Sequence, residues 1–194
     1  MDHGDHVALI RDGVRAAPPG RWLELGAGEG AFTLALADVL GNGARIVAVD
    51  RDARALERLR ARLGDRFPTA TVEPVVADFT HALPDGPFAG ILAANSLHFV
   101  KDLGPVLAAI RARLALDGRL VVVEYDADRG NPWVPHPFSF RRWSTLAPEA
   151  GFEPPQLLHR VPSRFLDAIY GAVTQPADLP VDERDPRGAQ RGIG

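Results

Sequence analysis

The stretch LELGAGEGAFTLALA, residues 23–37, determines how the rest of the chain is read. An apolar run ending at Leu25 is followed by three glycines at alternate positions and then by a helical pattern over 31–40, closed by Gly41-Asn42-Gly43. This order predicts a short buried strand, a tight turn and a helix. Glycines there let a ligand approach the free backbone N–H groups at the helix start. The stretch therefore predicts a nucleotide-binding turn.

The letters of this turn fit two patterns. Gly26, Gly28 and Ala31 match the dinucleotide fingerprint G-x-G-x-x-G/A. Glu24 followed by Gly26, Gly28 and Gly30 matches acidic-x-G-x-G-x-G, the turn of proteins that bind an adenosyl sulfonium. A turn that needs small residues only for packing would look the same, so the rest of the sequence has to decide.

Apolar runs alternate with helical patterns along the chain. Strands are expected at 21–25, 44–50, 71–78, 88–94 and 119–125, and helices at 31–40, 52–63, 103–114 and 139–150. Asp102 is expected to cap the third of these helices and Gly118 to stop it. Two final strands, 156–163 and 164–174, read as an antiparallel pair, although the second could equally be a helix. This alternation predicts an α/β fold with a doubly wound, Rossmann-like sheet.

Size and composition predict one globular domain. The chain has 194 residues, 46% of them hydrophobic, a net charge of −3 and no cysteine. This excludes disulfides and thiolate metal sites, and no run is long enough to span a membrane. We expect a cytoplasmic protein with its domain at 1–174, an N-terminal helical segment at 1–20 and a flexible tail at 175–194. His3 and His6 lack a third partner, so no metal site is expected.

Polar residues fall where the predicted strands end. Asp50 ends the second strand, twenty residues after Gly30, where a carboxylate can accept hydrogen bonds from ribose hydroxyls. Asp78 and Phe79 follow the third strand and offer an acceptor and a stacking face for adenine. Both aspartates could instead serve as a helix cap or a turn residue. Asn95 follows the fourth strand, on the other side of the expected crevice.

The runs LELGAGEG, VAVD, VVADF, ILAANSLHFV and LALDGRLVVVEY, in this order, resemble a class I S-adenosylmethionine-dependent methyltransferase over residues 5–174. The resemblance implies seven strands in the order 3-2-1-4-5-7-6, with strand 7 antiparallel. It also implies that S-adenosylmethionine is the cofactor. The residues that it assigns to this cofactor are Glu24, Gly26, Ala27, Gly28 and Gly30 (methionine end), Asp50 (ribose), Arg51, Asp78 and Phe79 (adenine) and Asn95 (methionine amino group).

The resemblance implies methyl transfer to an acceptor that the sequence does not identify and that we expect to be a small molecule. A non-catalytic sensor or scaffold that binds S-adenosylmethionine is an alternative. An NAD-dependent oxidoreductase is less well supported, because the chain after the fifth strand lacks a second parallel mononucleotide-binding half. Nucleic acid is not expected as a partner. Methyltransferases of this fold that act on exocyclic amines of DNA carry (D/N)-P-P-(Y/F/W) after strand four, where this chain has ANSL.

Two residues are predicted to take part in catalysis if the acceptor needs a base. His98 follows the fourth strand and Tyr125 ends the fifth. Imidazole accepts protons near neutral pH, although a histidine between Leu97 and Phe99 could equally be structural.

The loop and helix at 126–150 are predicted to contact the acceptor. NPWVPHPFSFRRW (131–143) concentrates aromatic residues, and Trp133, His136, Phe138 and Arg141 are the expected contacts. These aromatics could equally cover the sheet. Little sequence precedes the first strand, so the pocket is expected either to be small or to be completed by a second subunit in a homodimer.

Overall fold

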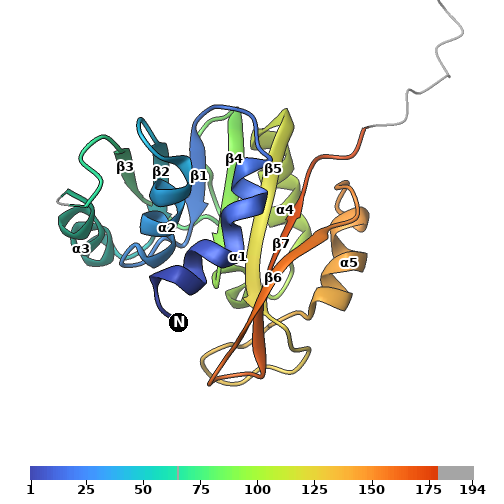
Figure 1. The fold of residues 1–194 in the computed structure, drawn as a ribbon. Helices are drawn as coiled ribbons and strands as arrows, with labels where there is room; N and C mark the ends of the chain where they lie inside the picture. The colour runs from blue at the N-terminus through green and yellow to red at the C-terminus, as the bar shows by residue number, and fades with distance from the viewer. Residues whose placement is uncertain (65, 179–194) are drawn as a thin grey trace, which may run out of the picture.

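A computed structural model describes residues 1–64 and 66–178 of the chain (Figure 1). The elements, in chain order, are α1 (His3–Arg15), β1 (Trp22–Leu25), α2 (Ala31–Leu40), β2 (Arg45–Asp50), α3 (Ala53–Gly64), β3 (Thr71–Val76), β4 (Phe88–Ala94), a 3-10 turn η1 (Leu97–Phe99), α4 (Gly104–Arg113), β5 (Leu114–Tyr125), α5 (Phe140–Glu149), β6 (Gln156–Pro162) and β7 (Ala168–Thr174). Of the flexible tail predicted at 175–194, residues 179–194 lie outside the described ranges.

The strands form one sheet in the order β3-β2-β1-β4-β5-β7-β6. The first five strands pair in parallel, and β7 runs antiparallel to both β5 and β6. The doubly wound fold and the strand order implied by the resemblance are confirmed. Pro74 lies on the edge strand β3, which tolerates a residue that has no N–H to donate.

Helices cover both faces of the sheet, as its buried strands require. Helices α1, α2 and α3 lie on one face of the sheet, and α4 and α5 lie on the other (Figure 1). Their apolar side chains form the clusters that cover the strands, and the cluster under α4 and α5 includes Trp143 and Phe138. Every residue of β1 and β4 is buried. Within the described ranges, no helix is long and apolar enough to cross a lipid bilayer.

The connection from α4 to β5 differs from the prediction. The helix ends at Arg113, and Leu114 already pairs with Phe88 of β4. Gly118 therefore lies inside β5, at an irregularity in the pairing, and does not stop the helix. Leu114 lies seven positions after Leu107, so it fits the apolar face of a helix as well as the start of a buried strand.

The start of the predicted tail is anchored to the domain. Pro176 bridges to Phe152, the Ala177 N–H donates to the Gly151 carbonyl at 3.0 Å, and Arg111 donates to the Ala177 carbonyl at 3.0 Å. Residues 175–178 thus belong to the folded part of the chain. The flexibility of the tail stays a prediction.

The sheet has its switch point between β1 and β4. From β1 the chain winds outward to β2 and β3, and then returns to β4 on the other side. In open α/β sheets, ligands bind outside the carboxyl ends of the strands at such a point. The glycine turn, Asp50, Asp78 and Asn95 all follow carboxyl ends here, so the fold brings the predicted residues to one edge.

Candidate functional site

The glycine turn is anchored to the neighbouring strand. The N–H groups of Gly26 and Ala27 both donate to the carbonyl of Val49, at 2.8 and 3.0 Å. Gly30 has φ +86° and forms the N-cap of α2, and a Cβ on it would lie 2.7 Å from the Leu59 side chain. Only glycine fits this conformation and this close packing without strain.

Gly26 brings the turn against the loop that follows β4. Its φ is +71°, and a Cβ built on it would lie 2.7 Å from Cβ of Ser96. A side chain at this position would therefore require both an unfavourable backbone conformation and a shift of Ser96. The turn after β1 and the loop after β4 thus approach each other at the switch point.

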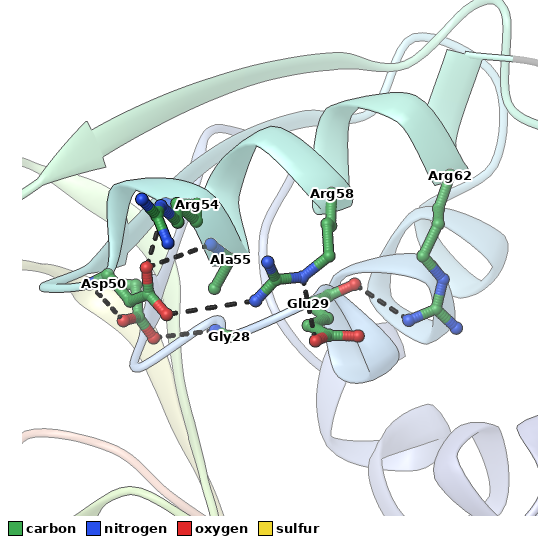
Figure 2. Close-up of polar contacts among 8 residues, drawn as sticks. Gly28, Glu29, Asp50, Arg54, Ala55, Arg58 and Arg62 are labelled. Carbon is green, nitrogen blue, oxygen red and sulfur yellow. Dashed lines mark hydrogen bonds and ion pairs between the residues drawn. The ribbon is translucent and has the colours of Figure 1, made fainter.

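Asp50 connects β2 to the glycine turn. Its Oδ2 accepts the Gly28 N–H at 2.7 Å, and its Oδ1 accepts the Asp52 N–H at 2.8 Å (Figure 2). A carboxylate oxygen has two lone-pair sites, so each oxygen can still accept from a ligand hydroxyl. Asp50 is therefore both a brace for the turn and an available acceptor.

A cavity of about 370 Å³ opens beside this carboxylate. Six of the ten residues predicted to bind the cofactor line it: Gly26, Asp50, Arg51, Asp78, Phe79 and Asn95. Ala77, Thr80, Ser96, Phe99 and Val100 complete the wall. Glu24, Ala27, Gly28 and Gly30 are not among the lining residues. Glu24 lies on β1, and the other three residues form part of the glycine turn. Gly28 contributes to the site through its hydrogen bond to Asp50.

Unused polar groups stand at one wall of this cavity. Asn95 Oδ1 and Ser96 Oγ are buried and have no hydrogen-bond partner among the described residues. Asn95 also has φ +51°, a left-handed conformation that is uncommon outside glycine. Buried polar atoms without partners are rare in native proteins, and an unfilled ligand site is a physical reason for them.

Asp78 also lines this cavity and presents an ionised carboxylate. The side chain and backbone N–H of Thr80 both donate to its Oδ1, at 2.6 and 2.9 Å, and these bonds lower the pKa of Asp78. Oδ2 lies 3.4 Å from His81 Nδ1 and accepts no hydrogen bond from the residues that the structure describes. Phe79 and Phe99 also line the cavity, so an acceptor and aromatic faces lie together, as an adenine ring would need.

Glu24 lies beneath the turn, away from the cavity. Its side chain is buried on β1, and Thr33 Oγ1 of α2 donates to its Oε2 at 2.6 Å. Burial raises the pKa of Glu24 to about 8, the nearby Asp50 charge adds to the rise, and the Thr33 hydrogen bond opposes it. The carboxyl is therefore mostly protonated at neutral pH, and Glu24 joins β1 to α2 as a neutral group.

Arginines of α3 hold the outer side of the turn. Arg58 Nε donates to Glu29 Oε1 at 2.9 Å, and Arg62 donates to the Glu29 carbonyl at 3.0 Å (Figure 2). The four-residue spacing of Arg54, Arg58 and Arg62 is by itself typical of a solvated helix face. In the structure, two arginines of α3 donate hydrogen bonds to Glu29, the turn residue between Gly28 and Gly30.

Replacing Arg58 with alanine is expected to weaken cofactor binding only slightly. Arg58 and Glu29 are about half exposed, so their ion pair contributes under about 1 kcal/mol and is screened by salt. We expect a two- to threefold rise in the Kd of S-adenosylhomocysteine at low salt, by calorimetry, that disappears at high salt. Arg60→Ala, on the same helix, is the control. A salt-independent rise would show that Arg58 acts on the turn other than through charge.

A second, larger cavity of about 770 Å³ lies on the other side of the loop after β4, and Val100 lines both cavities. His136, Phe138 and Arg142 line it, together with Lys101, which sequence reasoning missed. Two other predicted acceptor contacts do not line it. Trp133 is 73% exposed, and Arg141 pairs with Asp128 at 3.3 Å.

The two residues predicted for catalysis are buried and line neither of the two cavities. His98 is 3% exposed on η1 and Tyr125 is 9% exposed at the end of β5. Their rings lie 5.7 Å apart, edge to face. His98 Nδ1 lies 2.9 Å from Oε1 of Glu124, a fully buried carboxyl that sequence reasoning overlooked.

Comparison with known proteins identifies the class. The model of a methyltransferase domain family matches residues 23–122, just over half of the chain. The chain therefore belongs to this family, and its fold and turn are those of the class I S-adenosylmethionine-dependent methyltransferases. Proteins of this class take their methyl group from S-adenosylmethionine.

The chain matches one part of each of two longer curated proteins. The chain is 37% identical over 135 residues to the rRNA adenine N-6-methyltransferase of Streptomyces fradiae, covering 69% of this chain and 38% of the relative. It is 28% identical over 173 residues to the reducing polyketide synthase grgA of a Penicillium species, covering 76% of this chain and 7% of that protein. The chain thus spans well under half of either relative.

Solved structures share the fold. The 1,6-didemethyltoxoflavin-N1-methyltransferase of Burkholderia thailandensis, solved with 1,6-didemethyltoxoflavin and S-adenosylhomocysteine bound, superposes with a TM-score of 0.72 at 23% identity. The match covers 91% of this chain and 78% of that one. The YcgJ protein of Bacillus subtilis gives a TM-score of 0.71 at 13% identity, over 91% of this chain and all of that one.

The residues at the smaller cavity fit S-adenosylmethionine. Asp50 offers lone pairs for ribose hydroxyls, and Asp78 with Phe79 offers an acceptor and a face for adenine. The unpartnered Asn95 Oδ1 and Ser96 Oγ stand beside Gly26, where polar groups of the methionine end need partners. The donors and acceptors therefore agree with the cofactor of the family.

Proposed function

We propose that the protein transfers the methyl group of S-adenosylmethionine to a small organic acceptor bound in the larger cavity. The observation that carries this proposal is the pairing of two cavities across one loop. One cavity has the groups that an adenosyl ligand needs, and the other has the volume of a site for a compound of drug size. Val100 belongs to both walls, so ligands in the two cavities would be neighbours.

The lining of the larger cavity favours a small acceptor over a polyanion. Asp102, Asp128 and Glu149 line it together with Lys101 and Arg142, so the wall carries more carboxylates than fixed cations. A nucleic-acid backbone needs a cationic surface. The apolar part of the wall, which includes Leu103, Leu107, Phe138 and Leu146, suits a ligand with an apolar body.

In this proposal, residues of the protein hold and orient the bound cofactor. S-adenosylmethionine, when bound, supplies a methyl carbon already activated by a sulfonium. Asp50, Asp78 and Asn95 would hold that ligand at three points, and alignment of this kind lowers the barrier for an in-line displacement. Ser96 and His98, in the loop after β4, are each only 3% exposed.

Calorimetry tests the cofactor part of this proposal. S-adenosylmethionine and S-adenosylhomocysteine are expected to bind with a stoichiometry of one. NADH is expected not to bind, because the chain after β5 forms an antiparallel pair of strands and lacks a second parallel mononucleotide-binding half. Binding of NADH alone would overturn the proposal.

Turnover tests the catalytic part. Methyl-labelled S-adenosylmethionine should pass its label to compounds of a broad panel of hydroxyl, amine and thiol acceptors. Tight binding of S-adenosylhomocysteine without label transfer across the panel would favour the sensor or scaffold.

A further inference from the structure

The larger cavity is lined by residues of α4, of α5 and of the loop before α5, and these helices give it two distinct ends (Figure 1). Both helices begin where the parallel strands end. Helix α4 follows η1 after β4, and the Phe140 N–H at the start of α5 donates to Asp126 Oδ1, just after β5, at 2.8 Å. The other ends of the helices also meet, because Arg111 Nε of α4 donates to the Gly151 carbonyl at 2.7 Å. The cavity therefore has one end near the cofactor site, where Val100 lines both cavities, and one far end near Gly151.

Two cations without an ionic partner line the end near the cofactor site. Lys101 directly follows Val100, and Arg142 lies in the first turn of α5. Both line the cavity, and neither side chain forms an ion pair or a hydrogen bond with another residue that the structure describes. A guanidinium in this situation can donate two parallel hydrogen bonds to a carboxylate.

The carboxylates at the same end already have partners. Asp102 Oδ1 accepts the Gly104 N–H at 3.1 Å, at the start of α4. Asp128 accepts the Ser139 N–H at 3.1 Å and a hydrogen bond from Arg141 at 3.3 Å, and these contacts lower the pKa of Asp128. When Arg141 is included, the cations at this end outnumber the carboxylates.

The remaining carboxylate of the wall, Glu149, lies at the far end. It follows Arg142 by seven residues on α5, which places it about 10 Å further along the helix. Leu146 lies between them on the same helix face, and all three residues line the cavity. The cavity is therefore positive near the cofactor site and negative at the far end, with an apolar wall between.

We propose that the methyl acceptor carries a carboxylate and that Arg142 is the residue that determines this specificity, with Lys101 supplying a second positive charge. The inference rests on the proposed methyl transfer and names the class of acceptor, a small organic acid with an apolar body. The carboxylate serves to bind and orient the acceptor, and a different group of the acceptor receives the methyl group. The apolar body lies against Leu103, Leu107 and Phe138 of the same cavity.

The experiment uses pairs of acceptors that differ in charge but hardly in shape. Each pair is a benzoate and the corresponding benzamide, with the same methyl-accepting group, a hydroxyl, an amine or a thiol, in the para position. The benzoates are ionised at pH 7.5 and the benzamides are neutral. With methyl-labelled S-adenosylmethionine, we expect kcat/KM in at least one pair to be about 10- to 100-fold higher for the acid than for the amide.

Arg142→Gln should abolish this preference without abolishing transfer. Glutamine keeps a polar side chain and removes the charge. We expect the acid-to-amide ratio of kcat/KM to fall below about threefold, because KM of the acid rises while its kcat and both constants of the amide change little. Arg142→Lys keeps the charge but loses the two parallel donors, so it should retain part of the preference. A merely structural role of Arg142 would not distinguish the acid from the amide.

Arg129→Gln is the matched control. Arg129 is exposed in the loop between Asp128 and Gly130, which both line the cavity, but Arg129 itself does not line it. The substitution removes one positive charge close to the site, and we expect the acid-to-amide ratio to stay unchanged. A loss as large as that of Arg142→Gln would show that the general charge of this surface selects the acid, and would overturn the role of Arg142.

Binding is measured separately from turnover. Calorimetry with protein saturated with S-adenosylhomocysteine should give a lower Kd for the acid of the preferred pair than for its amide. This difference should disappear in Arg142→Gln, in which the Kd of S-adenosylhomocysteine itself should not change.

The remaining outcomes separate this inference from the proposed function. An acid-to-amide ratio below about threefold in every pair would overturn the inference while the proposed methyl transfer stands. Equal losses for acid and amide in Arg142→Gln, or a base-labile methyl ester as the product, would do the same. If no probe is methylated, acids that bind no more tightly than their amides would overturn the inference. Failure to bind S-adenosylhomocysteine would overturn the proposed function itself.

Discussion

Asp50→Asn is expected to weaken the binding of S-adenosylhomocysteine by about 100-fold, since a hydrogen bond to a charged group contributes about 1.5–3 kcal/mol. The native carboxylate accepts the Gly28 N–H on one oxygen and the Asp52 N–H on the other. Asparagine has one oxygen and one NH₂ group, so its NH₂ would face a backbone donor. The variant therefore loses a brace of the glycine turn and an acceptor for ribose together.

Calorimetry at constant ionic strength measures this effect, and thermal unfolding separates loss of binding from loss of fold. Asp117→Asn is the matched control, because Asp117 is exposed and lies in the first half of β5, away from the carboxyl ends of the strands. We expect Asp117→Asn to bind like the native protein. A change below about threefold in Asp50→Asn would show that Asp50 does not contact the ligand, contrary to its predicted role.

Periodicity and strand-end residues predicted much of this fold. The helix 31–40 and the strand 88–94 have the bounds that the sequence indicated, because a glycine or a proline flanks each of them. Asp50, Asp78 and Asn95 line one cavity because parallel strands end at one edge. Such residues can be found from local sequence alone, since the sheet rather than a particular contact brings them together.

Other features depend on tertiary contacts that local sequence does not encode. Glu124 directly follows the apolar run LVVV (120–123), and the local sequence gives no sign of its partner His98, which lies 26 residues earlier. The aromatic loop is a similar case. Phe138 and Trp143 are buried in the core, whereas Trp133 is largely exposed. Aromatic density predicted a wall over the site, but packing decides which rings form it and which cover the sheet.

Glu24→Gln is expected to make the stability of the protein less dependent on pH. The pKa of Glu24 is raised to about 8 in the folded chain, chiefly by burial, whereas a glutamate in the unfolded chain has its ordinary pKa of 4.5. Glu24 contributes its full stabilisation at pH values below its pKa in the unfolded chain. This stabilisation is lost as the pH rises through the pKa of Glu24 in the folded chain. Between pH 6 and pH 9 the native protein should therefore lose about 3 kcal/mol through this one group.

Glutamine cannot ionise, yet its side-chain oxygen can still accept from Thr33 Oγ1, so the variant keeps the link between β1 and α2. Urea denaturation of both proteins at pH 6 and pH 9 gives the difference, in which all other titrating groups cancel. Glu57→Gln, at an exposed position of α3, should follow the native profile. Parallel profiles for the native protein and Glu24→Gln would mean that Glu24 is ionised in the fold. A charged Glu24 would then need a cation close to the turn. This would contradict the neutral carboxyl that we infer from the burial of Glu24.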